Sequence, residues 1–165
     1  MKKALLIVLA VLFLLSSCAT ERVYSFPSKD GLRVFLRPVE LKGEYPLSLD
    51  ISIPSEKSRL SGDAVLNYTV DGKKDYMKAV DSVSLSFFAD DERIEPVSVE
   101  LMFAEGSGKD KISVRFTSVI GKEDMEKIMK GISGASLSVD GIEYPLDASA
   151  FNKSLSDLSS FYILQ

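Results

Sequence analysis

The sequence contains no histidine and a single cysteine, Cys18. Without histidine, acid–base catalysis by an imidazole is excluded, and so is a zinc site with histidine ligands. With only one cysteine, the chain cannot form an internal disulfide or a zinc site of several thiolates. The fold must therefore be held together by its hydrophobic core.

Basic residues are not in excess either. The chain carries 20 Lys and Arg against 24 Asp and Glu, which gives a formal net charge of −4. Lys2 and Lys3 both lie at the very start, so the rest of the chain is more acidic still. A protein that binds DNA or RNA needs a basic face to meet the phosphates. The sequence therefore predicts no nucleic-acid partner.

No apolar run in the sequence is long enough to span a bilayer as a helix. The longest run, residues 4–15, is about 12 residues long, whereas a spanning helix needs ~20. Lys2 and Lys3 stand before this run, and polar residues follow it. A charged start followed by a short apolar stretch is typical of a secretory signal peptide. We therefore expect residues 1–17 to be a signal peptide.

The residues that end this run carry a more specific signal, Leu15-Ser16-Ser17-Cys18. They resemble the lipobox of bacterial lipoproteins, in which a branched apolar residue and two small residues precede a cysteine. The resemblance implies that diacylglycerol is attached by a thioether to the Cys18 sulfur, and that a peptidase then cuts between Ser17 and Cys18. The new amine can then accept a further fatty acid such as palmitate. The residues also permit an ordinary secretory signal cut near Ser17 or Ala19, or an uncleaved anchor helix.

A lipid at Cys18 would determine where the protein resides. One acyl chain attaches a protein only weakly, at ~0.8 kcal/mol per buried CH₂, but two or three chains make the attachment effectively permanent. Ala19 occupies the position where some bacteria use Asp to retain lipoproteins in the inner membrane. The resemblance therefore implies a cell-envelope protein attached to the outer membrane, on either its periplasmic or its surface face.

The rest of the chain divides into a tether and one domain. Residues 19–31 mix polar residues with Pro27 and Gly31 and show no period, which indicates an irregular segment. We expect residues 18–31 to form the lipidated N-terminus and tether. Residues 32–165 have the usual size of a single domain, and they show no internal repeat.

Alternation of apolar and polar residues dominates this domain and predicts half-buried strands. Pro38 is expected to place the first strand at a sheet edge, and Asp71-Gly72 is expected to form a hairpin turn. Residues 83–116 contain three strands in succession, which predicts an antiparallel meander. The expected strands are 32–36, 47–53, 64–70, 83–87, 97–103, 112–116, 137–139 and 142–146.

Two segments show helical spacing instead. A short amphipathic helix is predicted near 122–132, with its apolar face formed by Met125, Ile128, Met129 and Ile132. A hairpin is predicted at Asp140-Gly141, and a final helix follows for which Asp147 can serve as the cap. Asn152 lies off the apolar face of that helix, which is formed by Phe151, Leu155, Leu158 and Tyr162.

Many short strands, two helices and no regular alternation of strand with helix predict a mainly β fold. We expect an antiparallel β-sandwich with a short helix near 122–132 and a C-terminal helix. A small β-barrel is the alternative that the same pattern allows.

No motif in the sequence indicates a particular reaction. No serine stands three residues before a lysine, and Glu95, Glu100 and Glu143 fall at outward positions of strands. We therefore expect no catalytic residue, no metal site and no cofactor. The sequence favours a non-catalytic lipoprotein with a binding, structural or assembly role toward an envelope protein or glycan. The alternative is a small hydrolase that uses carboxylate or serine side chains without histidine.

The aromatic residues mostly share the apolar phase of the strands, which indicates core packing. Phe35 and Phe88 fall out of that phase. These two rings are the candidates for an exposed platform on which a glycan could stack.

Overall fold

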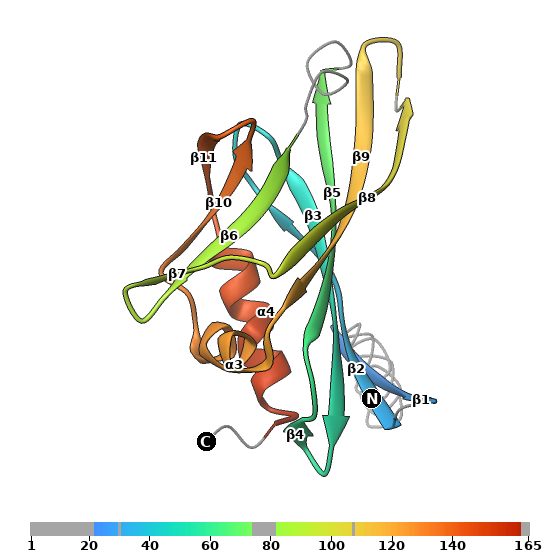
Figure 1. The fold of residues 1–165 in the computed structure, drawn as a ribbon, viewed down its shortest axis with the longest axis vertical. Coiled ribbons are helices and arrows are strands. Elements are labelled where there is room, and N and C mark those ends of the chain that lie inside the picture. The colour runs from blue at the N-terminus through green and yellow to red at the C-terminus, as the bar shows by residue number, and fades with distance from the viewer. Residues whose placement is uncertain (1–21, 30, 74–81, 107, 163–165) are drawn as a thin grey trace, which may run out of the picture.

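The computed structural model describes residues 22–29, 31–73, 82–106 and 108–162 (Figure 1). The expected signal peptide and the lipobox residues Leu15, Ser16, Ser17 and Cys18 lie outside the described residues. In the described part, the chain forms two antiparallel sheets and two helices. Each sheet ends in its own edge strands, so the predicted β-sandwich is confirmed and the barrel alternative is wrong.

The larger sheet contains seven strands in the order β1-β2-β3-β5-β9-β8, with the short strand β4 paired to β3. Its central strands alternate as the sequence predicts, because one face packs in the core while the other carries mostly polar side chains. The strands are β1 (Val23–Ser28), β2 (Gly31–Leu41), β3 (Leu47–Glu56), β4 (Arg59–Leu60), β5 (Ala64–Lys73), β8 (Ser98–Gly106) and β9 (Lys111–Ile120).

The smaller sheet has four strands in the order β11-β10-β6-β7, and it lies beside the upper part of the larger sheet in Figure 1. Two tight turns organise it. Asp90 and Asp91 join β6 to β7, and Asp140 and Gly141 join β10 to β11, all with positive φ between 50° and 80°. Turns of this hand match the twist of a hairpin. The strands are β6 (Val83–Ala89), β7 (Glu92–Ile94), β10 (Gly134–Val139) and β11 (Ile142–Leu146).

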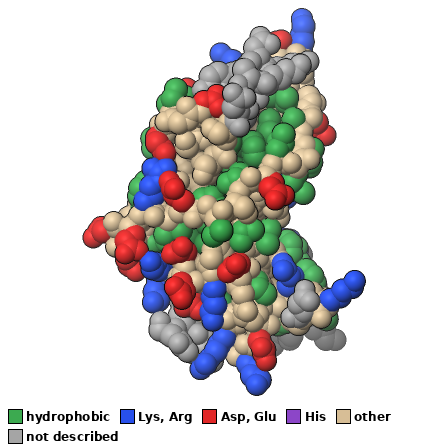
Figure 2. Space-filling view, in the orientation of Figure 1, with side chains coloured by type: hydrophobic (Ala, Val, Ile, Leu, Met, Phe, Trp, Pro, Cys, Tyr) green, Lys and Arg blue, Asp and Glu red, His purple; other side chains and the backbone are tan. Residues whose placement is uncertain are grey.

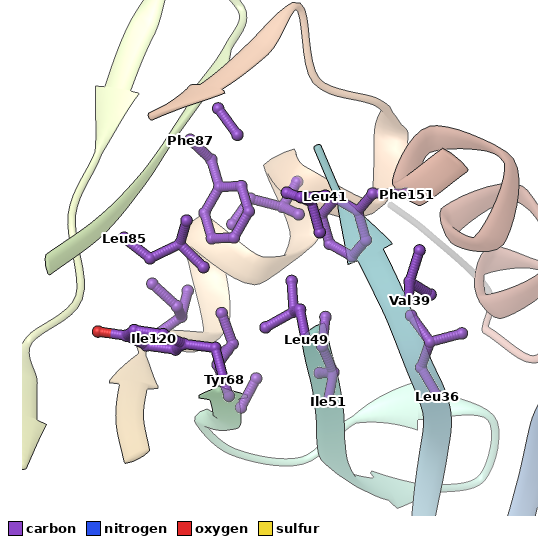
Figure 3. Packing of buried hydrophobic residues seen from close by; sticks show 14 of the residues in the cluster. Leu36, Val39, Leu41, Leu49, Ile51, Tyr68, Leu85, Phe87, Ile120 and Phe151 are labelled. Carbon is purple, nitrogen blue, oxygen red and sulfur yellow. The ribbon is translucent and has the colours of Figure 1, made fainter. Parts of the chain in front are cut away.

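Helices α3 (Lys122–Lys130) and α4 (Ser149–Ser159) lie below the smaller sheet and complete the core (Figure 1). Figure 3 shows side chains from both sheets and from α4 meeting in one cluster. Phe87 of β6 and Phe151 of α4 have ring centroids 5.5 Å apart, and both are fully buried. Burying one such side chain contributes about 1.5–3 kcal/mol.

Both helices bury the faces that the sequence predicts. The buried residues of α3 are Met125, Ile128 and Met129, and those at α4 include Phe151, Leu155, Leu158 and the following Tyr162. Ala148, rather than Asp147, is the N-cap residue of α4. The Asp147 Oδ1 atom still accepts a hydrogen bond from the Ser149 N–H at 2.9 Å, so the carboxylate serves the helix start as expected.

Two expectations about the start of the domain are wrong. Val23–Ser28, expected to lie in an irregular tether, forms β1 and pairs with β2 along its whole length. β2 is therefore an interior strand and not the edge strand that Pro38 suggested. The pairing of β2 with β3 shifts register between Leu36 and Val39. This shift accommodates Pro38, whose nitrogen carries no hydrogen for the ladder.

Two expectations about strand connections are also wrong. Asp71 and Gly72 do not form a turn but continue β5, where they pair with Ser113 and Ile112 of β9. The meander expected over residues 83–116 does not form, because β6 belongs to the smaller sheet while β8 and β9 form a hairpin in the larger one. Alternation within a strand specifies its buried face but not its neighbours.

Candidate functional site

β8 (Ser98–Gly106) is an edge strand with an exposed apolar surface. It pairs with β9 on one side, and no strand among the described residues lies on its other side. Val97 just before it is 76% exposed, Leu101 61%, Met102 52% and Phe103 45%. An edge of this kind presents unpaired backbone N–H and C=O groups together with apolar side chains.

A bulge places apolar side chains on both faces of β8. The pairing with β9 shifts between Leu101 and Phe103, so that Met102 is an extra residue. Leu101 lies opposite Phe116 on the core-facing side of the sheet, whereas Phe103 lies opposite Arg115 on the other side. Figure 2 shows hydrophobic side chains gathered in the region where β8 and β9 run. We refer to residues 97–104 as the β8 edge.

Two negatively charged side chains lie on β8, on either side of Phe103. Glu100 and Glu105 lie on the same face as Phe103, one on each side of it. Within the described part of the chain, no salt bridge joins either carboxylate to a cation. Arg115, opposite Phe103, already donates to Asp50 Oδ2 at 2.6 Å and to Thr69 Oγ1 at 3.0 Å. The β8 edge therefore suits a ligand that is apolar and basic.

The most buried carboxylate of the described residues, Asp50, has a structural role. Its Oδ1 atom accepts from Asn67 Nδ2 at 2.9 Å, and its Oδ2 atom accepts from Arg115 Nη2. Together with Thr69, these side chains connect β3, β5 and β9 on the outer face of the larger sheet. A carboxylate with both oxygens engaged in this way stabilises the strands and is poorly placed to act as a general acid or base.

Glu95 and Glu143, two acids that the sequence predicts at outward strand positions, are engaged in ion pairs. Glu95 and Glu143 both pair with Arg93, at 2.7 Å and 2.6 Å. The Ser136 hydroxyl and the Arg93 guanidinium beside it hold the pKa of Glu143 below its ordinary value. A general acid for glycoside hydrolysis needs the opposite shift, a raised pKa. In the described ranges, no three acidic, cysteine or histidine side chains gather as metal ligands.

Two of the buried serines, Ser86 and Ser154, accept hydrogen bonds from arginines, which cannot activate them as nucleophiles. Ser86 accepts from Arg93 Nη2 at 3.1 Å, and Ser154 accepts from Arg22 Nη1 at 3.2 Å. Ser154 itself donates to the Ala150 carbonyl oxygen at 3.1 Å. Arginine stays protonated in proteins and cannot take a proton from a hydroxyl group. These contacts position backbone elements and offer no base for a hydrolase.

The two aromatic residues outside the apolar phase do lie on outer faces of the sheets. Phe35 packs between Tyr24 and Phe26, with ring centroids 5.6 Å and 5.4 Å away. Phe88 lies beneath Arg93, whose Cζ atom is 6.0 Å from the ring centroid. Both rings are half-buried and contact neighbouring side chains, and their role toward a glycan stays a prediction.

The sequence makes its most specific prediction for Leu15, Ser16, Ser17 and Cys18. These residues lie outside the described residues, so lipidation at Cys18 stays a prediction. In the ranges that the structure describes, no helix combines the length and the apolar character needed to cross a membrane. Comparison of the chain with protein-family models, characterised proteins and solved structures finds no match.

Sequence reasoning missed the β8 edge. Its alternation of Val97, Val99, Leu101 and Phe103 resembles that of the core strands, which predicted burial of one face. The available signal was Met102, which interrupts the alternation and makes Leu101–Ala104 a continuous apolar run. Such a run at a bulge indicates apolar side chains on both faces of a strand.

Proposed function

We propose that this chain is a bacterial lipoprotein, attached to the outer membrane through Cys18, that binds an extended segment of another envelope protein along β8. In this proposal the protein has no catalytic role. The observation that supports the binding function is the β8 edge, where an edge strand carries exposed apolar side chains and has no strand on its outer side among the described residues. The lipobox residues Leu15-Ser16-Ser17-Cys18 support the membrane attachment.

Strand addition uses both features of this edge. Main-chain hydrogen bonds from a free edge supply affinity, and side chains on alternating faces supply selectivity. A segment that pairs with β8 would cover Leu101 on one face and Phe103 on the other. It would thereby remove from water two of the large apolar side chains that the larger sheet exposes.

Charge defines the chemistry of the segment. Glu100 and Glu105 flank Phe103, and no described cation neutralises them. Side chains directly opposite one another on paired strands attract when their charges differ and repel when they match. We therefore expect a segment in which lysine or arginine alternates with apolar residues.

The test uses the full chain in detergent micelles and a synthetic peptide of alternating valine and lysine. The matched probe is a peptide of alternating valine and glutamate. We expect the lysine peptide to bind about tenfold more tightly, because it complements Glu100 and Glu105. We also expect it to slow hydrogen exchange at the backbone amides of β8 and not at those of β1.

Two variants locate the binding edge. Phe103→Lys adds a cation on β8 and should weaken binding of the lysine peptide about tenfold. Tyr24→Lys makes the same change on β1, at the other edge of the sheet, where Tyr24 is 41% exposed. It should leave the affinity unchanged. Equal affinity for the two peptides, or equal loss in the two variants, would exclude β8 as the binding edge.

A further inference from the structure

A cavity of about 390 Å³ lies at the opposite end of the larger sheet from β8. It forms where β1 begins, where β2 shifts register, and where α4 begins. Arg22, Arg37 and Lys42 all line it, together with Ala150 in the first turn of α4. In a chain with more acidic than basic residues, three cations around one cavity indicate an anionic ligand.

The backbone places the two arginine residues next to each other. The Arg37 N–H donates to the Arg22 carbonyl oxygen over 2.8 Å, so the two residues lie side by side. Arg37 and Pro38 occupy the register shift at which β2 contains one residue more than β3. The cavity therefore lies beside the register shift that accommodates Pro38.

Within the described residues, no carboxylate forms an ion pair with either arginine. Arg22 Nη1 donates to Ser154 Oγ of α4 at 3.2 Å, and the Arg37 Cζ atom lies 5.7 Å from the centroid of the Tyr24 ring. Both contacts hold the guanidinium groups in place and leave their charge unpaired. No salt bridge to Arg22 or Arg37 forms among the residues that the structure describes.

The other groups around the cavity partly balance one another. The Ser149 N–H and hydroxyl, and then the Lys42 ammonium, hold the pKa of Asp147 below its ordinary value, so Lys42 already faces a carboxylate. Glu40 also lines the cavity and opposes an anion. The first backbone N–H groups of a helix have no partner within the helix and favour an anion. In α4, the Ser149 N–H already donates to Asp147 Oδ1, so the N–H groups that follow it face the cavity end of the helix.

We propose that this cavity binds a phosphate group. A guanidinium fork donates two parallel hydrogen bonds to a phosphate, and a phosphate has enough oxygens to accept from Arg22 and Arg37 together. A phospholipid headgroup and a free phosphate share this chemistry. Arg22 follows Cys18 by four residues, a reach of at most about 14 Å, so a headgroup is within range of a lipidated chain. The site itself depends neither on β8 nor on lipidation.

The test measures binding to the full chain in detergent micelles by NMR. Inorganic phosphate and glycerol 3-phosphate serve as probes, and glycerol is the uncharged control. We expect both phosphates to shift the amide signals of Arg37 and Ala150, and we expect glycerol to shift neither. Tighter binding of glycerol 3-phosphate would identify a lipid headgroup as the source, whereas equal binding would identify free phosphate.

Three variants test the cavity. Arg37→Gln removes an unpaired cation and should raise the dissociation constant for phosphate about tenfold. Arg33→Gln removes the same charge from β2 outside the cavity, where Arg33 donates to Ser52 Oγ at 2.8 Å, and should have little effect. Glu40→Gln removes the opposing carboxylate and should tighten binding. All three residues are at least partly exposed, so each variant should fold.

Two results would overturn the proposal. One is the absence of phosphate-dependent shifts at Arg37 and Ala150. The other is an equal loss of affinity in Arg37→Gln and Arg33→Gln, which would show that phosphate responds only to the net charge of the chain. A loss in Arg37→Gln together with a gain in Glu40→Gln would establish the cavity as the binding site.

Discussion

Asn152 connects helix α4 to the segment after α3 through both halves of its amide group. The Oδ1 atom accepts from the Ile132 N–H at 3.0 Å, and the Nδ2 atom donates to the Ile132 carbonyl oxygen at 2.8 Å. Both backbone groups of one residue are thereby satisfied by a single side chain. A buried backbone group that loses its partner costs about 1–3 kcal/mol.

Asn152→Asp should therefore destabilise the protein. The substitution replaces the Nδ2 donor with a carboxylate oxygen that faces the Ile132 carbonyl oxygen. We expect a loss of about 1–3 kcal/mol in the free energy of unfolding, measured by urea denaturation near neutral pH. Lys153→Gln, at the exposed neighbouring position, should change it by less than about 0.5 kcal/mol. Equal curves for the two variants would show that the amide contributes nothing.

The role of Asn152 could not be predicted from the helical pattern. Asn152 lies off the apolar face of α4, a position that by itself predicts a nearly silent substitution. The two hydrogen bonds to Ile132 predict the opposite, and the helical pattern could not indicate them because Ile132 is distant in sequence and meets α4 only in the folded chain. A contact between a side chain and a backbone group distant in sequence produces no periodic pattern of residues.

At the scale of the element, α4 is a structural helix that packs on the larger sheet. Phe151, Leu155 and Leu158 are 0–1% exposed, and the element with the most contacts to α4 is β2. The apolar face is therefore covered within the same chain. A helix detached from the domain to bind a partner would expose this face, and the structure shows the reverse.

Leu155→Asp tests the packing of α4. Truncating a buried leucine costs about 2–5 kcal/mol, and a buried carboxylate without a partner should cost at least as much. We expect a large drop in the melting temperature, or a chain that fails to fold. Ser156→Asp adds the same charge at the exposed neighbouring position and should leave the melting temperature nearly unchanged. A silent Leu155→Asp would mean that α4 detaches in solution.

Local elements could be predicted more securely than their pairing. Asp140-Gly141 forms the expected hairpin, because both flanking strands pair directly across it. Asp71-Gly72 carries the same turn signal, yet β9 pairs with it and extends the strand through Lys73. Both helices could be predicted because the spacing of their apolar residues indicates one buried face. Strand β1 could not, since its alternation is weak and its position depends on β2.

At the scale of the whole molecule, a seven-stranded sheet and a four-stranded sheet enclose the core. The smaller sheet and the two helices cover the inner face of the larger sheet, while the β8 edge stays exposed (Figure 1). The β8 edge and the cationic cavity lie at opposite edges of the larger sheet. The proposed partner segment and the proposed phosphate would therefore not compete for the same surface.

The lipid anchor is tested by Cys18→Ser in a bacterial host. Serine cannot form the thioether, and the peptidase that cleaves lipoproteins acts on the lipidated precursor. We expect the variant to retain its leader, to migrate more slowly on a gel, and to incorporate no fatty-acid analogue during metabolic labelling. Ser16→Ala keeps a small residue in the lipobox and should be labelled normally. Equal labelling of Cys18→Ser and the unmodified chain would refute the anchor.

The bulge at Met102 affects whether copies of this chain can associate with one another through β8. Proteins held on a membrane surface meet one another repeatedly, and a flat, free strand edge is a template on which further copies can stack into aggregates. The extra residue at Met102 breaks the regular spacing of hydrogen-bonding groups along β8. A short segment can still pair on either side of the bulge, whereas a second copy of the same edge carries the same interruption. The irregular strand would therefore leave the edge open to the proposed partner segment while it hinders self-association.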